Sequence, residues 1–294
     1  NELLVWQLLQ TPFATAFYGC YHRAEFISFL SEPMLGGNLY QRYEADKNLV
    51  GSSKHARYYL ASVILALEHM HNLNILCRGV TLENLVLDSL GRMKVCNFTL
   101  SKIIAERTFT TCGVPAYMPP EVVQSRGHGF AYDWWSCGVL LFEILAGHPP
   151  WGKNLNTGTW EIYKRINKGF KVSWITCPLY AKTAHPLIKS LLRYEPSQRL
   201  PMKKTGASCG CGSSSGVEGL KRHWWFRGFN WKSLENQKMV PPYLPEVKDK
   251  NDLSHFRASE KDVPKVVPYE GLEEKSSMWT EVFGELVAES KAPS

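Results

Sequence analysis

The feature that most constrains this 294-residue chain is an apolar helix predicted over residues 130–147. The stretch contains no proline, it ends at Gly147, and two prolines follow shortly after. Large apolar side chains face every direction around it, so we expect the helix to be buried nearly all round. Two acidic residues, Asp133 and Glu143, interrupt it. Since an unpaired buried carboxylate is costly, Asp133 is expected to accept backbone N–H bonds from a neighbouring loop.

Composition limits the classes of protein that this helix can belong to. Apolar residues make up 44% of the chain, enough for one large domain or two small ones. The net charge of +7 is modest and the basic residues are dispersed, so we expect no nucleic-acid partner. We find no signal peptide or membrane span, and the eight cysteines are spaced irregularly, so a cytoplasmic protein is expected. A helical pattern is already under way at Asn1, which predicts a piece of a longer polypeptide.

Hydrophobic periodicity predicts a mixture of helices and short strands. Residues 99–124 are expected to be irregular, and the chain after Trp231 is expected to be an extended polar tail. Helices are predicted at 2–9, 53–71, 160–168 and 184–193, and strands at 17–20, 26–31, 75–76, 85–87 and 93–96.

Three blocks before the central helix resemble the signature loops of eukaryotic protein kinases. Residues 77–84 (Cys-Arg-Gly-Val-Thr-Leu-Glu-Asn) are similar to the catalytic loop, and residues 97–99 (Asn-Phe-Thr) to the metal-binding loop. Residues 112–121 are similar to the end of the activation segment. The chain resembles most the AGC branch, with its C-terminal tail, and within it the cyclic-nucleotide-dependent (cGMP/cAMP) serine/threonine kinases. Segments 108–113, 127–135, 223–231 and 279–283 carry this finer resemblance.

The resemblance implies an α+β, bilobal fold with a mostly helical large lobe and an extended C-terminal tail. We expect part of a small lobe over 1–34, the large lobe over 35–226 and the tail over 227–294. Glu2 falls on the acid that pairs with the phosphate-gripping lysine in the family. The small lobe is therefore expected to be incomplete at its N-terminus, without the Gly-rich loop and that lysine.

Three positions that handle phosphate and metal in the family lack their charge here. The catalytic aspartate position holds Gly79, so no carboxylate is present to accept the substrate proton. The lysine that neutralises the transferred phosphoryl group is replaced by Thr81. The metal-chelating aspartate is replaced by Asn97, a neutral amide that binds magnesium far more weakly. The chain is therefore expected to be a pseudokinase in which phosphoryl transfer is absent or vestigial.

Other matched positions keep the family's residue type. The acid of the Pro-Pro-Glu triplet is expected to pair with a later arginine, and Asp133 with the backbone at Arg78 and Gly79. Arg78 is expected to grip a phosphate on Thr110, if that residue is phosphorylated. Five residues thus match those that order the activation segment and lock the large lobe: Arg78, Thr110, Glu121, Asp133 and Arg199.

Candidate ligand-binding positions carry two interpretations. The apolar ones either line an adenine pocket or fill a collapsed one, and Asn38 replaces an acid that touches ribose. Candidates for the nucleotide are Glu32, Met34, Asn38, Glu83, Asn84, Val86, Cys96 and Phe256. Weak metal ligands would be Asn84 and Asn97, and acids for a basic peptide would be Glu83 and Glu143. Trp279 and Phe283 resemble the hydrophobic motif of the tail.

These residues support two functions. The first is a regulatory or scaffolding module that binds a protein partner or an intramolecular regulatory domain, such as a cyclic-nucleotide-binding one. The second is a divergent ATP-dependent serine/threonine kinase with slow phosphoryl transfer. At most weak binding of ATP and Mg²⁺ is expected, and the fold is expected to require neither. A non-functional fragment is the remaining alternative.

Overall fold

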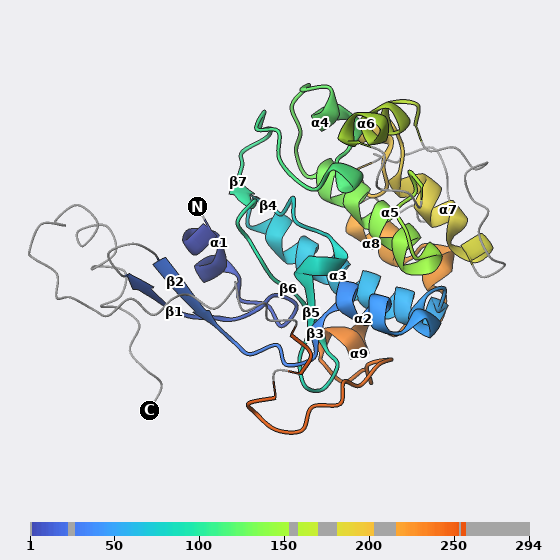
Figure 1. The fold of residues 1–294 in the computed structure, drawn as a ribbon. Coiled ribbons are helices and arrows are strands. Elements are labelled where there is room, and N and C mark those ends of the chain that lie inside the picture. Colours follow the sequence, from blue (N-terminus) through green and yellow to red (C-terminus); the bar gives the residue numbers. More distant parts are fainter. Residues whose placement is uncertain are drawn as a thin grey trace, which may run out of the picture. The chain divides into compact units, whose positions relative to one another are not determined.

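A computed structural model describes residues 2–22, 27–152, 158–169, 181–202, 216–252 and 254–256 (Figure 1). The chain divides into a large unit, residues 1–16 with 33–255, and a small unit, residues 17–32 with 256–294. The helices are α1 (Glu2–Leu8), α2 (Leu39–Ala45), α3 (Ser53–Asn72), α4 (Pro120–Val123), α5 (Ala131–Ala146), α6 (Thr159–Asn167), α7 (Ala181–Leu191), α8 (Val217–Lys221) and α9 (Trp231–Glu235). The strands are β1 (Phe17–His22), β2 (Ile27–Ser31), β3 (Gly37–Asn38), β4 (Ile75–Leu76), β5 (Leu85–Leu87), β6 (Met93–Val95) and β7 (Lys102–Ile103).

The central helix α5 is the core of the large unit, as predicted. Every residue from Ala131 to Leu145 except Glu143 is buried. The helix packs against α3 and α7 (Figure 1). It ends at Gly147, whose φ of 75° lies in the left-handed region that glycine adopts without strain. A helix buried on this scale leaves its first-turn acid, Asp133, no access to water.

Helix α3 provides the second layer of this core. Its N-cap residue Ser52 accepts a hydrogen bond from the backbone of His55, and the periodic apolar residues that predicted it are buried. The helix packs on α5 and on β6. Helix α3 thus supports both the central helix and the sheet that carries the signature loops.

Two small sheets hold those loops. Strands β3, β5 and β6 form an antiparallel sheet in which Val86 pairs with both Asn38 and Lys94. Strands β4 and β7 form an antiparallel pair. The segment 99–124 is less irregular than predicted, since it contains β7 and α4. Both are too short, at two and four residues, to give a periodic signal.

The described part of the small unit is an antiparallel hairpin. Strands β1 and β2 pair Tyr21 with Ser28, and the register shifts between Phe17 and Gly19. This confirms the two strands predicted from the apolar runs. Of the other residues in this unit, only Glu32 and Phe256 are described.

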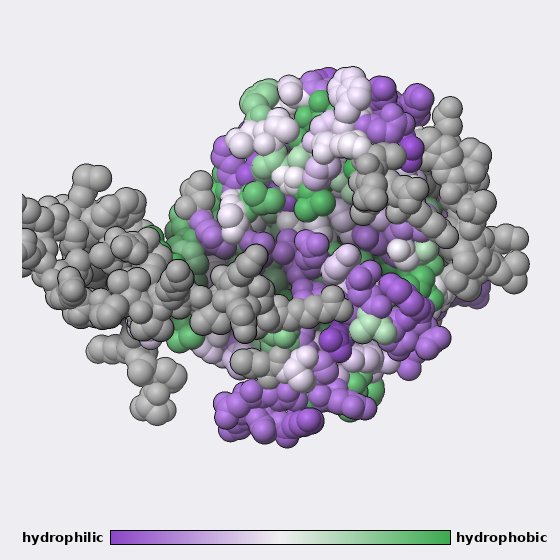
Figure 2. Space-filling model, in the orientation of Figure 1, coloured by the Kyte–Doolittle hydropathy of each residue, from purple (hydrophilic) through white to green (hydrophobic). Residues whose placement is uncertain are grey.

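The C-terminal region begins with more structure than predicted. Helix α9 occupies the start of the expected tail, because Asn230 caps its N-terminus and Leu234 is buried. The described residues beyond it, 236–252 and 254–256, form no helix or strand, and polar residues colour the lower edge of Figure 2 purple. This segment passes so close to Gly91 that a β-carbon there would lie 2.0 Å from the Tyr243 carbonyl oxygen. Trp279 and Phe283 lie outside the described residues.

Candidate functional site

The loop after β4 is held by Asp133 of α5. Asp133 is fully buried and accepts hydrogen bonds from the amides of Cys77 (3.0 Å) and Arg78 (2.8 Å). The expected partners were Arg78 and Gly79, so the pairing is shifted by one residue. His71 adds a third contact, with Nε2 2.8 Å from the carboxylate. Asp133 thereby meets the requirement for partners that its burial imposes.

Arg78 reaches from this loop to the activation segment. Its backbone has a φ of 57°, and its side chain is buried. The guanidinium donates to the carbonyl oxygen of Leu100 at 2.8 Å and lies 3.5 Å from that of Thr110. It also lies 3.5 Å from Nε2 of His128. Burial and the Arg78 charge lower the pKa of His128 to about 4, so this ring is neutral at physiological pH.

A buried ion pair closes the far side of the activation segment. Both carboxylate oxygens of Glu121 lie 2.6 Å from the guanidinium of Arg199, as the resemblance implied. Arg199 is fully buried, and its remaining N–H groups donate to the backbone carbonyls of Ala131, Arg193 and Tyr194. Its guanidinium also lies over the ring of Trp135. Every donor of this arginine is therefore used, which is the condition under which a buried ion pair is tolerated.

The two catalytic-loop positions without charge, Gly79 and Thr81, differ in how well they fit the loop. A β-carbon at Gly79 would meet the carbonyl oxygen of Asn97 at 3.4 Å, an ordinary contact, so the backbone does not demand glycine there. Thr81 is buried, and its hydroxyl has no hydrogen-bond partner among the residues that the structure describes.

The candidate metal ligands contact each other. Asn84 donates through Nδ2 to the carbonyl oxygen of Gly79 at 2.9 Å, and Asn97 donates through Nδ2 to Oδ1 of Asn84 at 3.2 Å. The hydroxyl of Thr99 lies 2.7 Å from Oδ1 of Asn97 and 3.0 Å from a carboxylate oxygen of Glu2 in α1. Across the described ranges, no group of three His, Cys, Asp or Glu side chains is placed to hold a metal ion.

The candidate nucleotide positions of the large unit gather on the β3–β5–β6 sheet. Asn38 and Val86 are paired residues, and the amide of Cys96 donates to the carbonyl of Asn84 at 2.9 Å. Asn38 also caps α2, because its Oδ1 accepts from the backbone of Gln41. Met34 is buried just before this sheet. Glu83 is exposed and directly precedes Asn84. Glu32 and Phe256, the remaining two candidates, belong to the small unit.

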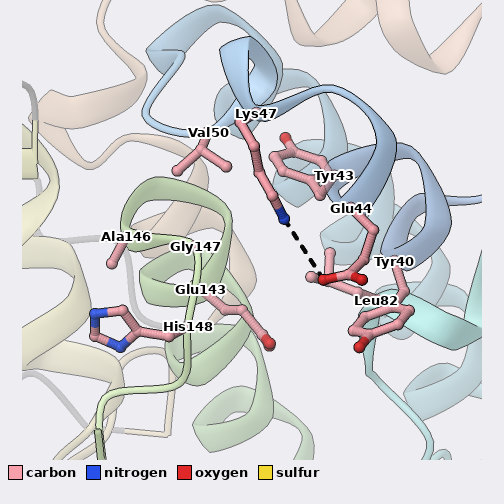
Figure 3. Close-up of a pocket in the computed structure, with 10 residues that line it drawn as sticks. All are labelled: Tyr40, Tyr43, Glu44, Lys47, Val50, Leu82, Glu143, Ala146, Gly147 and His148. Atoms are coloured by element: carbon pink, nitrogen blue, oxygen red, sulfur yellow. Dashed lines mark hydrogen bonds and ion pairs between the residues drawn. The ribbon is translucent and has the colours of Figure 1, made fainter. Parts of the chain in front are cut away.

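The peptide-recognition candidate Glu143 lines a pocket of about 400 Å³ (Figure 3). Its carboxylate comes from α5, and Glu44 of α2 lies across the pocket in an ion pair with Lys47. Tyr117 donates its hydroxyl to Glu143. Burial, opposed by this hydrogen bond and helped by the nearby charge of Glu83, raises the pKa of Glu143 to about 7. The pocket thus holds Glu44, which is exposed and paired with Lys47, and Glu143, whose pKa is raised to about 7.

Sequence reasoning missed three contacts of the site. They are the contact of His71 with Asp133, the hydrogen bond that Lys102 donates to Thr108 at 3.0 Å, and the contact of Thr99 with Glu2 in α1. The partners are 62, 6 and 97 residues away in the chain, respectively. No periodic pattern reports such pairs, whereas an alignment with the family's loops identifies the loop positions themselves.

Comparisons with known proteins agree with this geometry. The family model described as protein kinase domain matches residues 1–208. A cAMP-dependent protein kinase catalytic subunit of Dictyostelium discoideum is 35% identical over 257 residues, which are 87% of this chain and 37% of that protein. The human cAMP-dependent protein kinase catalytic subunit PRKX is 33% identical over 93% of this chain and 72% of its own length. A cGMP-dependent protein kinase of Caenorhabditis elegans is 32% identical over 84% of this chain and 30% of its own length.

These matches cover the signature loops, the central helix and most of the chain. The mixture of helices and small sheets is the α+β organisation expected of the family. No helix among the described residues has the length and apolar character needed to span a membrane. The chain belongs to the protein kinase domain family, in the AGC branch that contains the cAMP- and cGMP-dependent protein kinases.

Proposed function

We propose that this kinase domain is a pseudokinase that acts as a regulatory or scaffolding module. The observation that carries the proposal is the loss of charge at Gly79, Thr81 and Asn97 in loops whose backbone is still held by Asp133. Members of the family generally use ATP and Mg²⁺, and their catalysis depends on positioning and on charge stabilisation. Here the frame is present and the charges are not.

The expected loss of rate is large. Removing a general base typically costs about 10²–10⁴-fold. Removing an electrostatic contact to the reacting group typically costs about 10²–10³-fold more, although such effects are not additive. The three atoms nearest to a β-carbon at Gly79 are the backbone carbonyl oxygens of Asn97 and Cys77 and Nδ2 of Asn84, so no carboxylate oxygen is among them. A site with these losses supports binding better than it supports chemistry.

The proposed partner is a cyclic-nucleotide-binding segment, either in the same polypeptide or in another subunit. The relatives named above are cAMP- and cGMP-dependent kinases, and this chain spans only 37% of the first of them. Within the chain we propose the small-lobe part over 1–34, the large lobe over 35–226 and the tail over 227–294. Arg78 and Thr110 are the proposed control point, because phosphate on Thr110 would add a charged acceptor beside a guanidinium already 3.5 Å from its carbonyl.

A titration with ATP tests this proposal. The melting temperature of the protein is measured over increasing ATP with millimolar Mg²⁺ and with EDTA. A regulatory module is expected to show no stabilisation by ATP, or the same stabilisation in both conditions. A stabilisation that requires magnesium would contradict the proposal and favour a working nucleotide site.

The second candidate function is slow serine/threonine phosphorylation. It is favoured by one observation, the retention of Glu83 and Asn84 next to an intact Arg78–Asp133 frame. For this function, Asn84 and Asn97 would have to hold magnesium well enough for slow turnover. The same titration distinguishes the two, since a slow enzyme requires the magnesium-dependent stabilisation.

A further inference from the structure

Two asparagine side chains meet at the position where the family's metal-binding residues lie. Asn84 is the last residue of the catalytic loop and Asn97 the first of the metal-binding loop, and each side chain makes a hydrogen bond to the backbone. These anchors fix the orientation of each amide group, and the orientation decides whether the pair can hold a cation.

The orientation of Asn97 follows from Thr99. The backbone N–H of Thr99 can only donate, and it points at Oδ1 of Asn97 from 3.4 Å. Oδ1 therefore faces Thr99, and Nδ2 faces Asn84. The orientation of Asn84 follows in the same way, because the carbonyl oxygen of Gly79 can only accept and lies 2.9 Å from Nδ2 of Asn84. Oδ1 of Asn84 is left to face Nδ2 of Asn97, at 3.2 Å.

This arrangement does not fit a divalent cation. Mg²⁺ requires about six oxygen ligands in near-octahedral geometry, and a nitrogen that carries hydrogens cannot be one of them. One amide oxygen of the pair already accepts an N–H, and the other accepts from Thr99. An aspartate at position 97 would instead place an oxygen opposite Oδ1 of Asn84, and two facing oxygens need a positive group between them.

We infer that the Nδ2 group of Asn97 supplies, from within the chain, the positive partner that a divalent cation would supply between two oxygens. The Asn84–Asn97 hydrogen bond then joins the two loops without a metal ion. The hydroxyl of Thr99 lies within hydrogen-bond distance of both Oδ1 of Asn97 and the carboxylate of Glu2, so it links the asparagine pair to α1. Its single hydrogen is donated to one of these two oxygens at a time. The backbone tolerates this, since the φ of 61° at Asn97 is one that asparagine adopts more readily than most residues.

The inference is independent of the proposed function. Phosphoryl transfer through some other cation site would overturn the proposed function and leave the amide pair unaffected. Conversely, magnesium bound at Asn84 and Asn97 would overturn the inference even in a protein without activity.

The test is the substitution Asn97→Asp, which keeps the acceptor for Thr99 and replaces only Nδ2 by oxygen. In EDTA the variant is expected to melt a few degrees below the wild type, and millimolar Mg²⁺ or Mn²⁺ is expected to restore most of the loss. The melting temperature of the wild type is expected to be the same in both conditions. The control is Asn230→Asp, which makes the same change at an exposed helix cap and keeps the capping oxygen.

A wild type stabilised by Mg²⁺ as much as the variant would overturn the inference, as would a variant indifferent to metal. Should Asn97→Asp fail to fold, the inference is tested by Mn²⁺ binding, measured as the loss of the EPR signal of free Mn²⁺. Wild type and Asn84→Ala are expected to leave equal amounts of free Mn²⁺. Mn²⁺ captured by the wild type and not by Asn84→Ala would overturn the inference.

Discussion

The buried side of the activation segment contains charged residues, whereas the loops at 79–84 and 97–99 lack charge at three expected positions. On the buried side, Glu121, Asp133 and Arg199 are charged, inaccessible to water and supplied with a partner for each oxygen or N–H named above. In the loops, the resemblance places Gly79, Thr81 and Asn97 at positions where the family has charged residues.

The difference shows which charges the fold requires. A buried charge with a complete set of partners is part of the packing, and removing one member leaves the others unpaired. The charges absent from the loops would face a nucleotide and its ions, and among the three replaced positions only Thr81 leaves a buried polar group, its hydroxyl, without a described partner. The contrast predicts that substitutions on the buried side cost stability and that restoring the carboxylate at Gly79 costs little.

The largest effect is expected from Glu121→Gln. The change leaves the fully buried guanidinium of Arg199 without its counter-charge, so we expect a loss of about 3–5 kcal/mol in the free energy of unfolding. Urea denaturation measures it. The control is Glu161→Gln, which breaks a half-exposed pair with Arg165 and is expected to cost less than about 1 kcal/mol. Equal losses in the two variants would remove the contrast between the regions.

The next largest effect is expected from Asp133→Asn. The amide has one oxygen for the N–H groups of Cys77 and Arg78 and for His71, and its own NH₂ group meets a donor. We expect a loss of about 1–3 kcal/mol, measured in the same way. Asp249→Asn makes the same change at an exposed turn, where one oxygen accepts from Asn251. A variant at 133 as stable as the one at 249 would contradict the role given to Asp133.

Glu143→Gln is expected to change how stability depends on pH. The pKa of Glu143 is about 7 in the folded chain and near 4.5 when exposed, so the folded state holds this proton more tightly. The contribution of Glu143 to stability is therefore lost as pH rises from about 4.5 to 7, and the variant lacks this contribution at every pH. The difference between wild type and variant is expected to change by roughly 1–3 kcal/mol over that window. Glu44→Gln, in the same pocket but exposed, is the control, and equal differences at pH 4 and pH 8 for Glu143→Gln would refute the shifted pKa.

The smallest effect is expected from Gly79→Asp, which restores the family's carboxylate. Since a β-carbon fits there at 3.4 Å from its nearest neighbour, stability is expected to change by less than about 1 kcal/mol. Thermal denaturation measures this. At Gly37 the φ is 73° and a β-carbon would lie 2.8 Å from the carbonyl of His255, so Gly37→Asp is expected to be strongly destabilising. Equal losses at the two positions would mean that the fold requires glycine at 79.

The local pattern of apolar residues predicted the elements that are long and periodic. The helix at α5 and the hairpin β1–β2 follow directly from apolar runs and their terminators. The short strand β7 and helix α9 were missed because too few residues carry the pattern. The loop residues were located by resemblance to the family, but their bonding was not. The Asn84–Asn97 contact and the shift of the Asp133 partners to Cys77 depend on how segments far apart in the chain are brought together.

The most direct test of the central claim is a phosphoryl-transfer assay on the protein at its natural length. Labelled ATP, millimolar Mg²⁺ and a panel of basic serine and threonine peptides are incubated with the wild type, and transfer to peptide and to the protein itself is measured. The lost charges predict no magnesium-dependent transfer above the level without protein. Transfer that requires magnesium and is abolished by an ATP-competitive kinase inhibitor would contradict the claim that this site has lost its chemistry.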